Sequence, residues 1–234
     1  MEFHFKPKSK LEKFGQKVSD LLVENSYPTY YVGGMVRDTL LNRKITDIDL
    51  ATAAHPEQVV RIFTQACITH DASSKRFGIV KALEGNSFVE VTTLREDRPS
   101  SDRYPKVRFI TNIVQDSNRR DFTINSLYLS QKNNKILDYH KGAADIKKKK
   151  IRFIGEPTKR IKEDPLRILR AIRFALDLKF KLEPRTKRAI INNFELLNTL
   201  TSSKINSEVM KFSDGKMRLK FKKLIENKYL LTSI

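Results

Sequence analysis

Two aspartates separated by one residue, Asp47 and Asp49, are the first residues whose type and spacing indicate chemistry. The run from Ile45 to Ala51 predicts a β-strand, and residues two apart in a strand point to the same face. The two carboxylates would then repel each other and raise each other's pKa. A divalent cation removes this conflict, and oxygen ligands suit Mg²⁺. We therefore predict a metal site here, although an Asp-x-Asp sequence taken alone is more often a solvated strand edge.

A pair of glycines, Gly33-Gly34, follows a short run typical of a strand, Thr29 to Val32. The next residues, Met35 to Leu41, predict a short helix. Glycines at a strand end let the backbone approach a ligand closely, and a helix start presents free N–H groups to an anion. This segment and Arg37 therefore form a candidate phosphate site. Taken singly, the glycines also fit an ordinary turn, and the arginine also fits a surface ion pair with the aspartate that follows it.

Further polar candidates lie in the middle of the chain. Glu90 stands in a predicted strand, Phe88 to Leu94, where a catalytic role and an exposed strand position weigh equally. The run from Ser117 to Leu129 predicts a helix, which would set Asp121 and Asn125 one turn apart on one face. Polar groups so placed can hold a ribose hydroxyl. Asp121 near a helix start also favours the helix dipole without any ligand.

A polar helix face is predicted after residue 163. Asp164, Arg167 and Arg170 stand at positions i, i+3 and i+6 and share this face. An aspartate acceptor beside an arginine donor fork can read a planar, hydrogen-bonding ligand. Asp164 directly before Pro165 also fits the N-cap of the helix, which is a purely structural role.

Taken together, these segments resemble the signature of the nucleotidyltransferase superfamily that contains polymerase β. The extended form, Gly33-Gly34-Met35-Val36-Arg37-Asp38, resembles the class II branch, which holds bacterial CCA-adding tRNA nucleotidyltransferases and poly(A) polymerases. The resemblance runs from about residue 28 to residue 180. It implies an α+β fold, in which a polymerase-β-like nucleotidyltransferase head with a mixed sheet (residues 1–145) precedes an all-helical neck or RNA-binding region (residues 146–234).

The resemblance also implies an activity, namely template-independent addition of C or A to the 3′ end of tRNA from CTP and ATP. Two Mg²⁺ ions would lie between three carboxylates, Asp47, Asp49 and Glu90. In the family, the residues matching Asp164 and Arg167 offer hydrogen bonds to the base edge of the incoming nucleotide. The implied nucleotide-binding residues are Gly33, Gly34, Arg37, Arg120, Asp121, Asn125, Asp164, Arg167 and Arg170.

The remaining pattern predicts the elements that position these residues. They are helices over residues 8–25 and 56–66, a hairpin of 78–83 with 88–94, a strand over 136–139, and helices from about residue 144 onward. The polar run 95–106 contains two prolines and predicts a mobile loop. The segment from Asp102 to Phe109 resembles the corresponding loop of CCA-adding enzymes.

The charge and the composition of the chain limit the partners that it can have. Residues 141–234 hold 25 Lys and Arg against 10 Asp and Glu, a net of +15, whereas residues 1–140 hold 21 against 17, a net of +4. Such positive charge favours RNA binding through counterion release. A generally lysine-rich organism would also explain the excess of positive charge. The single cysteine, Cys67, and the absence of a signal-like apolar start predict a cytoplasmic protein. No run of 18 apolar residues occurs, so we expect no membrane partner.

Three alternative functions stay open. Poly(A) polymerase is the close one, favoured by the run Asn125-Ser126-Leu127-Tyr128. A partial enzyme that adds only CC or only A is another. The third is a non-catalytic RNA-binding remnant, because the sequence ends at Ile234, where family members usually continue into helical regions that grip tRNA. A second polypeptide or an oligomer would then complete the RNA-binding region. Against a remnant, Asp47 beside Asp49 would destabilise the fold without gain.

Overall fold

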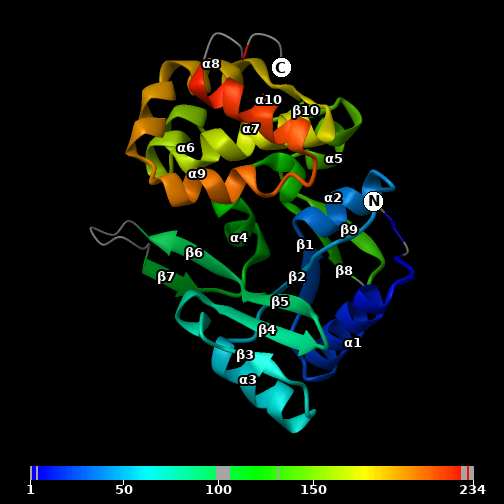
Figure 1. Cartoon of the computed structure of the whole chain (residues 1–234). Coiled ribbons are helices and arrows are strands. Elements are labelled where there is room, and N and C mark those ends of the chain that lie inside the picture. The colour runs from blue at the N-terminus through cyan, green and yellow to red at the C-terminus, as the bar shows by residue number, and fades with distance from the viewer. Residues whose placement is uncertain (1, 4, 99–105, 131, 228–230, 232–234) are drawn as a thin grey trace. The chain divides into compact units, whose positions relative to one another are not determined.

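The chain folds into two compact units in a computed structural model (Figure 1). The first unit holds residues 1–120 and 125–139, and the second holds residues 121–124 and 140–234. The predicted functional division after residue 145 stays a prediction. The structure describes all residues except 1, 4, 99–105, 131, 228–230 and 232–234.

The first unit is built on a mixed, seven-stranded sheet with the strand order β3-β4-β5-β2-β1-β8-β9. β2 and β5 are parallel neighbours, and the other neighbours are antiparallel. The predicted mixed sheet is therefore confirmed. The strands are β1 (Thr29–Val32), β2 (Ile48–Thr52), β3 (His70–Asp71), β4 (Ile79–Glu84), β5 (Ser87–Thr93), β8 (Leu127–Ser130) and β9 (Lys135–Asp138).

Helix α1 packs against β1, β2 and β5 of this sheet (Figure 1). Its apolar residues recur with helical spacing, and Phe14, Val18 and Leu22 are buried. Gly15 permits a close approach to β2, because a Cβ there would lie 2.6 Å from Cδ1 of Ile48. The helices of the first unit are α1 (Lys10–Glu24), α2 (Gly34–Leu40), α3 (Pro56–Gln65) and α4 (Ile113–Arg119), with a 3₁₀ turn at Lys75–Phe77.

Most of the predicted elements in the first unit are confirmed. The helices expected over residues 8–25, 35–41 and 56–66 are α1, α2 and α3, with ends shifted by one or two residues. The expected hairpin is β4 with β5, which a two-residue turn at Gly85-Asn86 connects. The strands expected over 29–32 and 136–139 are β1 and β9.

The helix predicted from Ser117 to Leu129 is wrong. Helix α4 ends at Arg119, and Arg120 is extended at φ −67° and ψ 160°. A 3₁₀ turn (Thr123–Asn125) follows, and the chain then enters β8, whose four residues are all buried. A short, continuous apolar run cannot be assigned to helix or strand by periodicity alone. Here pairing with β1 on one side and β9 on the other decides for strand.

The prediction of a loop over residues 95–106 is wrong at both ends, where the chain forms strands. β6 (Arg95–Arg98) pairs with β7 (Lys106–Phe109) as an antiparallel hairpin. Across these strands Arg108 Nε donates to Glu96 Oε1 at 2.7 Å, and opposite charges facing each other stabilise such a pair. β6 contains no apolar residue, and β7 alternates over only four residues, so the sequence pattern is too short to predict the hairpin. Residues 99–105, including part of the segment likened to the CCA-adding loop, lie outside the described residues.

The second unit is largely helical and is centred on α7. The Phe122 ring stacks on Phe153 with centroids 4.9 Å apart and meets Phe174 of α7 edge-on at 5.6 Å. Two short parallel strands interrupt the helices expected after residue 144. The sequence did not predict these strands, because a strand of two residues shows no periodicity. The elements are α5 (Gly142–Lys147), β10 (Lys150–Ile151), α6 (Pro157–Glu163), α7 (Leu166–Leu178), β11 (Lys181–Leu182), α8 (Pro184–Asn192), a 3₁₀ helix (Phe194–Thr199), α9 (Ser202–Val209) and α10 (Gly215–Glu226).

Each helix among the described residues is too short or too polar to cross a lipid bilayer.

Candidate active site

Strand β2 carries Asp49 in the middle of the sheet. Its neighbours Ile48 and Leu50 are buried, and alternation along the strand turns Asp49 to the opposite face. In register, Asp49 is paired with Glu90 of β5 on one side and with Val32 of β1 on the other. Residues in register on adjacent strands share a face. The structure therefore brings the predicted residues Asp49 and Glu90 side by side.

Asp47 does not lie on this strand. β2 begins at Ile48, so the predicted strand from Ile45 was too long, and Asp47 is an exposed residue just before it. The hydroxyl of Thr46 donates to Asp47 Oδ2 at 3.2 Å. Among the residues that the structure describes, no three His, Cys, Asp or Glu side chains are gathered closely enough to hold a metal ion. The predicted set of three carboxylates is thus assembled only in its Asp49–Glu90 part.

The pKa of Asp49 indicates that the Asp49–Glu90 pair would be stabilised by a cation. Burial, followed by the charges of Glu90 and Asp47, raises the pKa of Asp49 to about 6, although Arg120 and Arg37 oppose the shift. A half-buried carboxylate facing another carboxylate is an unbalanced negative charge at neutral pH. Such an oxygen donor set suits a hard divalent cation. The residues present therefore fit a metal of that class.

The glycine turn lies directly against Asp49. Gly33 adopts φ +73° and ψ −135°, a conformation that side-chain-bearing residues avoid. A Cβ at this position would lie 3.3 Å from Asp49 Oδ2. The turn thus needs glycine both for its backbone and for the carboxylate beside it. The predicted close approach of this backbone to a phosphate stays a prediction.

Arg37 of α2 is buried beside the same turn. Its Nε and Nη2 donate to the two carboxylate oxygens of Asp38 at 3.0 and 2.8 Å. Its Nη1 donates to Asn125 Oδ1 at 2.7 Å. A Cβ on Gly34 would lie 3.4 Å from Arg37 Nη2. The guanidinium is therefore fixed against the glycine turn.

Asp121 and Asn125 do not share the helical face that the sequence predicts. Asn125 bonds to Arg37 in the first unit. Asp121 belongs to the second unit, where its Oδ2 accepts from Arg170 Nε of α7 at 2.7 Å. The cause is the end of α4 before residue 121, which removes the one-turn spacing.

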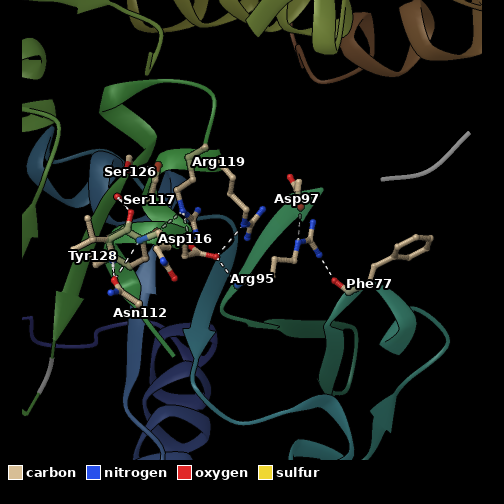
Figure 2. Close-up of polar contacts among 12 residues, drawn as sticks. Phe77, Arg95, Asp97, Asn112, Asp116, Ser117, Arg119, Ser126 and Tyr128 are labelled. Atoms are coloured by element: carbon tan, nitrogen blue, oxygen red, sulfur yellow. Dashed lines mark hydrogen bonds and ion pairs between the residues drawn. The ribbon is translucent and has the colours of Figure 1, made fainter. Parts of the chain in front are cut away.

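A buried carboxylate that the sequence analysis did not single out organises the residues around Arg120. Asp116 of α4 is completely buried, and Figure 2 shows it at the centre of a polar cluster. Its Oδ1 accepts from Arg119 Nε at 2.9 Å and from the Arg95 backbone N–H at 3.1 Å. Its Oδ2 accepts from Arg120 Nη2 at 3.1 Å and from the Tyr128 hydroxyl at 2.6 Å. The Asp-x-x-Arg-Arg spacing was the available signal for the arginine contacts.

Arg95 anchors the start of the β6–β7 hairpin in the same cluster. Besides the bond of its backbone to Asp116, its side chain donates to the carbonyl of Phe77 and lies 3.5 Å from Asp97 Oδ1 (Figure 2). Although burial by itself raises the pKa of Asp116, Arg120 and Arg119 hold it below its ordinary value. The cluster therefore keeps this carboxylate charged and the hairpin base fixed.

In the second unit, the predicted recognition residues lie where α6 meets α7. Asp164 Oδ1 accepts from the Leu166 N–H at 3.0 Å, so its structural capping role is confirmed. Arg167 Nη1 donates to Glu163 Oε2 at 2.9 Å and to the Arg160 carbonyl at 2.7 Å. Their predicted role toward a nucleotide stays a prediction.

A cavity of about 690 Å³ also lies in the second unit. Arg152 on its wall is oriented by the buried Asp145, which accepts from Arg152 Nε at 2.8 Å. Arg185 and Arg188 of α8 line it one helical turn apart and are exposed. The two acids of its lining, Glu156 and Glu183, accept backbone N–H groups at the starts of α6 and α8. The cavity therefore presents arginine side chains suited to an anionic ligand.

Known proteins share this fold. Residues 29–152 match the family model of the poly A polymerase head domain. The chain therefore belongs to the poly A polymerase head domain family, and the resemblance identified in the sequence is confirmed.

Individual relatives and solved structures agree. A CCA-adding enzyme of Lactobacillus delbrueckii subsp. bulgaricus is 41% identical over 201 residues, covering 85% of this chain and 50% of the relative. A CCA-adding enzyme of Bacillus licheniformis is 39% identical, covering 83% and 48%. The Bacillus stearothermophilus CCA-adding enzyme in complex with CTP matches at 34% identity and a TM-score of 0.76, covering 86% of this chain and 48% of that one. The chain thus spans about half the length of the curated relatives it matches.

Proposed function

We propose that this chain is the nucleotidyltransferase part of an enzyme that adds C and A to the 3′ end of tRNA without a template, using CTP and ATP. The observation that carries the proposal is the Asp49–Glu90 carboxylate pair beside the Gly33-Gly34 turn. The names of its relatives support the reaction, and solved relatives in complex with CTP and with ATP support the two substrates.

The proposed cofactor is Mg²⁺. Asp49 and Glu90, joined by Asp47, would hold it, and the raised pKa of Asp49 supports a missing positive charge at this position. When bound, a divalent ion supplies charge that lowers the pKa of the attacking hydroxyl and offsets charge on the leaving phosphates.

The proposed reaction is an in-line displacement. The 3′-oxygen of the RNA forms a bond to the α-phosphorus, the bond to the bridging oxygen breaks, and pyrophosphate and the hydroxyl proton leave. The glycine turn admits the triphosphate close to the backbone, and Arg37 and Arg120 supply positive charge to it. Asp38 and Asn125 hold Arg37 in place, so that little reorganisation is needed when charge develops.

Choice of nucleotide is assigned to the second unit in this proposal. Asp164, Arg167 and Arg170, together with Asp121, would offer acceptors and donor forks to the base and ribose of the nucleotide. Residues 1–145 would act as the catalytic head and residues 146–234 as the neck that reads the nucleotide and contacts RNA.

The proposed partner is tRNA, and the charge of the chain supports it. The net charge of +15 over residues 141–234 favours a polyanion, and the arginine-lined cavity offers one place for phosphates. We further propose a cytoplasmic location. A second polypeptide or an oligomer that completes the RNA-binding region belongs to the same proposal, because the relatives are about twice as long.

A nucleotide-extension assay tests the proposal. The 234-residue chain is incubated with Mg²⁺, labelled CTP or ATP, and tRNA transcripts that end before CCA, after C or after CC. Addition that stops at CCA supports tRNA repair, and addition limited to CC or to A indicates a partial enzyme. No incorporation into any substrate by the folded protein would contradict catalysis by this chain and favour an RNA-binding remnant.

The second candidate function is poly(A) polymerase, which the name of the matched family model favours. An unstructured RNA in the same assay separates the two. Long A tracts on that RNA would identify a poly(A) polymerase, whereas a CCA-adding enzyme leaves it unextended.

A further inference from the structure

The register of the sheet places Tyr128 on the same face as the carboxylate pair. Asp49 is opposite Val32, and Val32 is opposite Tyr128, so Glu90, Asp49, Val32 and Tyr128 form one row across β5, β2, β1 and β8. Tyr128 is two strands from Asp49, which corresponds to about 10 Å between their backbones. The row thus runs from the candidate metal ligands to a buried tyrosine.

Arg120 stands over this tyrosine. Its guanidinium carbon lies 4.9 Å from the centre of the Tyr128 ring, and its Nε donates to the Tyr128 hydroxyl at 2.8 Å. Since the ring lies on the face of Asp49, Arg120 lies on that face too. The charge of Arg120 also reaches Asp49, because it is among the groups that lower the pKa of that carboxylate.

Two groups fix the orientation of this guanidinium. Tyr128 accepts from Arg120 Nε, and Asp116 Oδ2 accepts from Nη2 at 3.1 Å. The tyrosine hydroxyl in turn donates to Asp116 at 2.6 Å, which closes a triangle of three side chains. A planar guanidinium held along one edge by two acceptors cannot rotate without breaking both contacts.

Fold stability alone does not call for such a triangle. A buried ionic network costs desolvation, and apolar side chains of similar volume are often as stable or more so. The Asp116 carboxylate is also shared by two arginines, Arg119 and Arg120. A guanidinium that is fixed in direction and placed on the face of the carboxylate pair suits an anionic ligand.

We propose that Asp116 and Tyr128 are positioning residues that hold Arg120 in the orientation in which it binds the phosphates of the incoming nucleotide. This inference rests on the proposed function, and it adds two residues that do not themselves touch the substrate. Pyrophosphate, the product of the reaction, carries the same chemistry and should depend on the same pair.

The substitution Tyr128→Phe tests the pair with little risk to the fold. It keeps the ring and removes only the hydroxyl that bonds to Asp116 and Arg120. The chain offers a matched control in Tyr31→Phe. Tyr31 is equally buried on the adjacent strand, faces the other side of the sheet, and its hydroxyl has no hydrogen-bond partner among the described residues.

The expected result is a loss of nucleotide affinity confined to Tyr128→Phe. The KM for CTP and the inhibition constant of pyrophosphate should both rise by roughly tenfold, the usual effect of weakening a hydrogen bond to a charged group. The KM for tRNA should stay within about twofold. Tyr31→Phe should leave all three constants unchanged.

Direct binding of CTP and pyrophosphate, measured by calorimetry, separates this inference from the proposed function. Should Tyr128→Phe bind both as tightly as Tyr31→Phe does, the positioning role is wrong, even if the Tm falls. Should wild type bind CTP but extend no RNA, the proposed function fails while the comparison of the two variants still decides the inference. A wild-type chain that binds neither ligand would overturn both.

Discussion

At Asp49, the charged carboxylate that the proposed chemistry requires also lowers the stability of the first unit. Its pKa is raised to about 6 from an ordinary value of 3.8, first by burial and then by Glu90. A carboxylate whose pKa is higher in the folded state binds protons more tightly there, so it favours folding at low pH and opposes it at high pH. The loss of stability should therefore occur between about pH 4 and pH 6.

We predict that Asp49→Asn abolishes this pH dependence. In a metal chelator at pH 8, the Tm of the variant should exceed that of wild type, because the neutral amide removes the buried charge. At pH 4 the two proteins should melt at similar temperatures. Thermal melts across this range provide the measurement, and a variant less stable than wild type at pH 8 would show that Asp49 is satisfied by its surroundings.

Gly33 gives a second test at the scale of a residue. We predict that Gly33→Ala costs about 1–2 kcal/mol of unfolding free energy, because alanine resists a positive φ, and that it also impairs nucleotide addition by placing a Cβ 3.3 Å from Asp49 Oδ2. Gly85→Ala is the control, since Gly85 has φ +58° but no atom within 4 Å of an added Cβ. Equal activity of the two variants in the extension assay would contradict the role of the turn.

The sequence predicted Gly33 and Asp49 from short-range signals, a glycine at a strand end and carboxylates spaced by two, and Glu90 from the family resemblance. The structure places these three residues together, whereas Asp47 lies just before the strand. The sequence analysis missed Asp116 and Tyr128. Tyr128 is twelve residues from Asp116 and reaches it only because β8 pairs with β1, and local spacing carries no information on that pairing.

At the scale of elements, a buried ion pair links α7 to α9 in the second unit. Arg173 Nε of α7 donates to Glu208 Oε2 of α9 at 2.6 Å, and Glu208 also bonds to Lys211. Although burial alone raises the pKa of Glu208, Arg173 and Lys211 hold it below its ordinary value. A lowered pKa stabilises the fold above the ordinary pKa of 4.5, and this contribution is lost as the pH falls below it.

We predict that Glu208→Gln lowers the unfolding free energy by about 3 kcal/mol at pH 7, since it removes the buried carboxylate charge that pairs with Arg173 and Lys211. The difference from wild type should shrink below pH 4.5, where wild type loses the same interaction. Denaturant melts at pH 7 and pH 3.5 provide the measurement. The exposed Glu195→Gln should change stability by less than about 0.5 kcal/mol, and an equally small effect of Glu208→Gln would contradict the linkage.

Helices and strands were predictable where the periodic spacing of apolar residues extends over several turns or residues. Helix α1 has four turns of apolar spacing and was predicted nearly to its ends. β8 has only four residues, all buried, and was taken for part of a helix. β6 has no apolar residue and β7 has only two, so the hairpin is evident only from the pairing of the two strands.

At the scale of the whole molecule, the uneven charge is the feature that the sequence alone establishes. The sequence could not predict that residues 121–124 belong to the second unit, because this depends on long-range contacts such as that of Asp121 with Arg170. The charge, by contrast, is obtained by counting residues, and it supports the proposed RNA-contacting role of residues 141–234.

We predict that the arginines of the cavity contribute phosphate contacts to RNA binding. The double variant Arg185→Ala/Arg188→Ala should weaken binding of a tRNA transcript and flatten the dependence of log Kd on log salt by about 1–2 units of slope. Lys220→Ala/Lys223→Ala, which removes two exposed charges with the same spacing on α10, serves as the control. Fluorescence anisotropy at several salt concentrations measures both, and identical slopes for the two variants would exclude a special role of the cavity.

The most direct test of the account compares Mg²⁺-dependent incorporation of labelled CTP into a tRNA transcript lacking CCA by wild type and by Asp49→Asn. The account predicts incorporation by wild type and a loss of about a thousandfold or more in the variant. Because the variant should melt at or above the wild-type temperature, unfolding cannot explain that loss. Incorporation that persists in Asp49→Asn would contradict the assignment of the catalytic site.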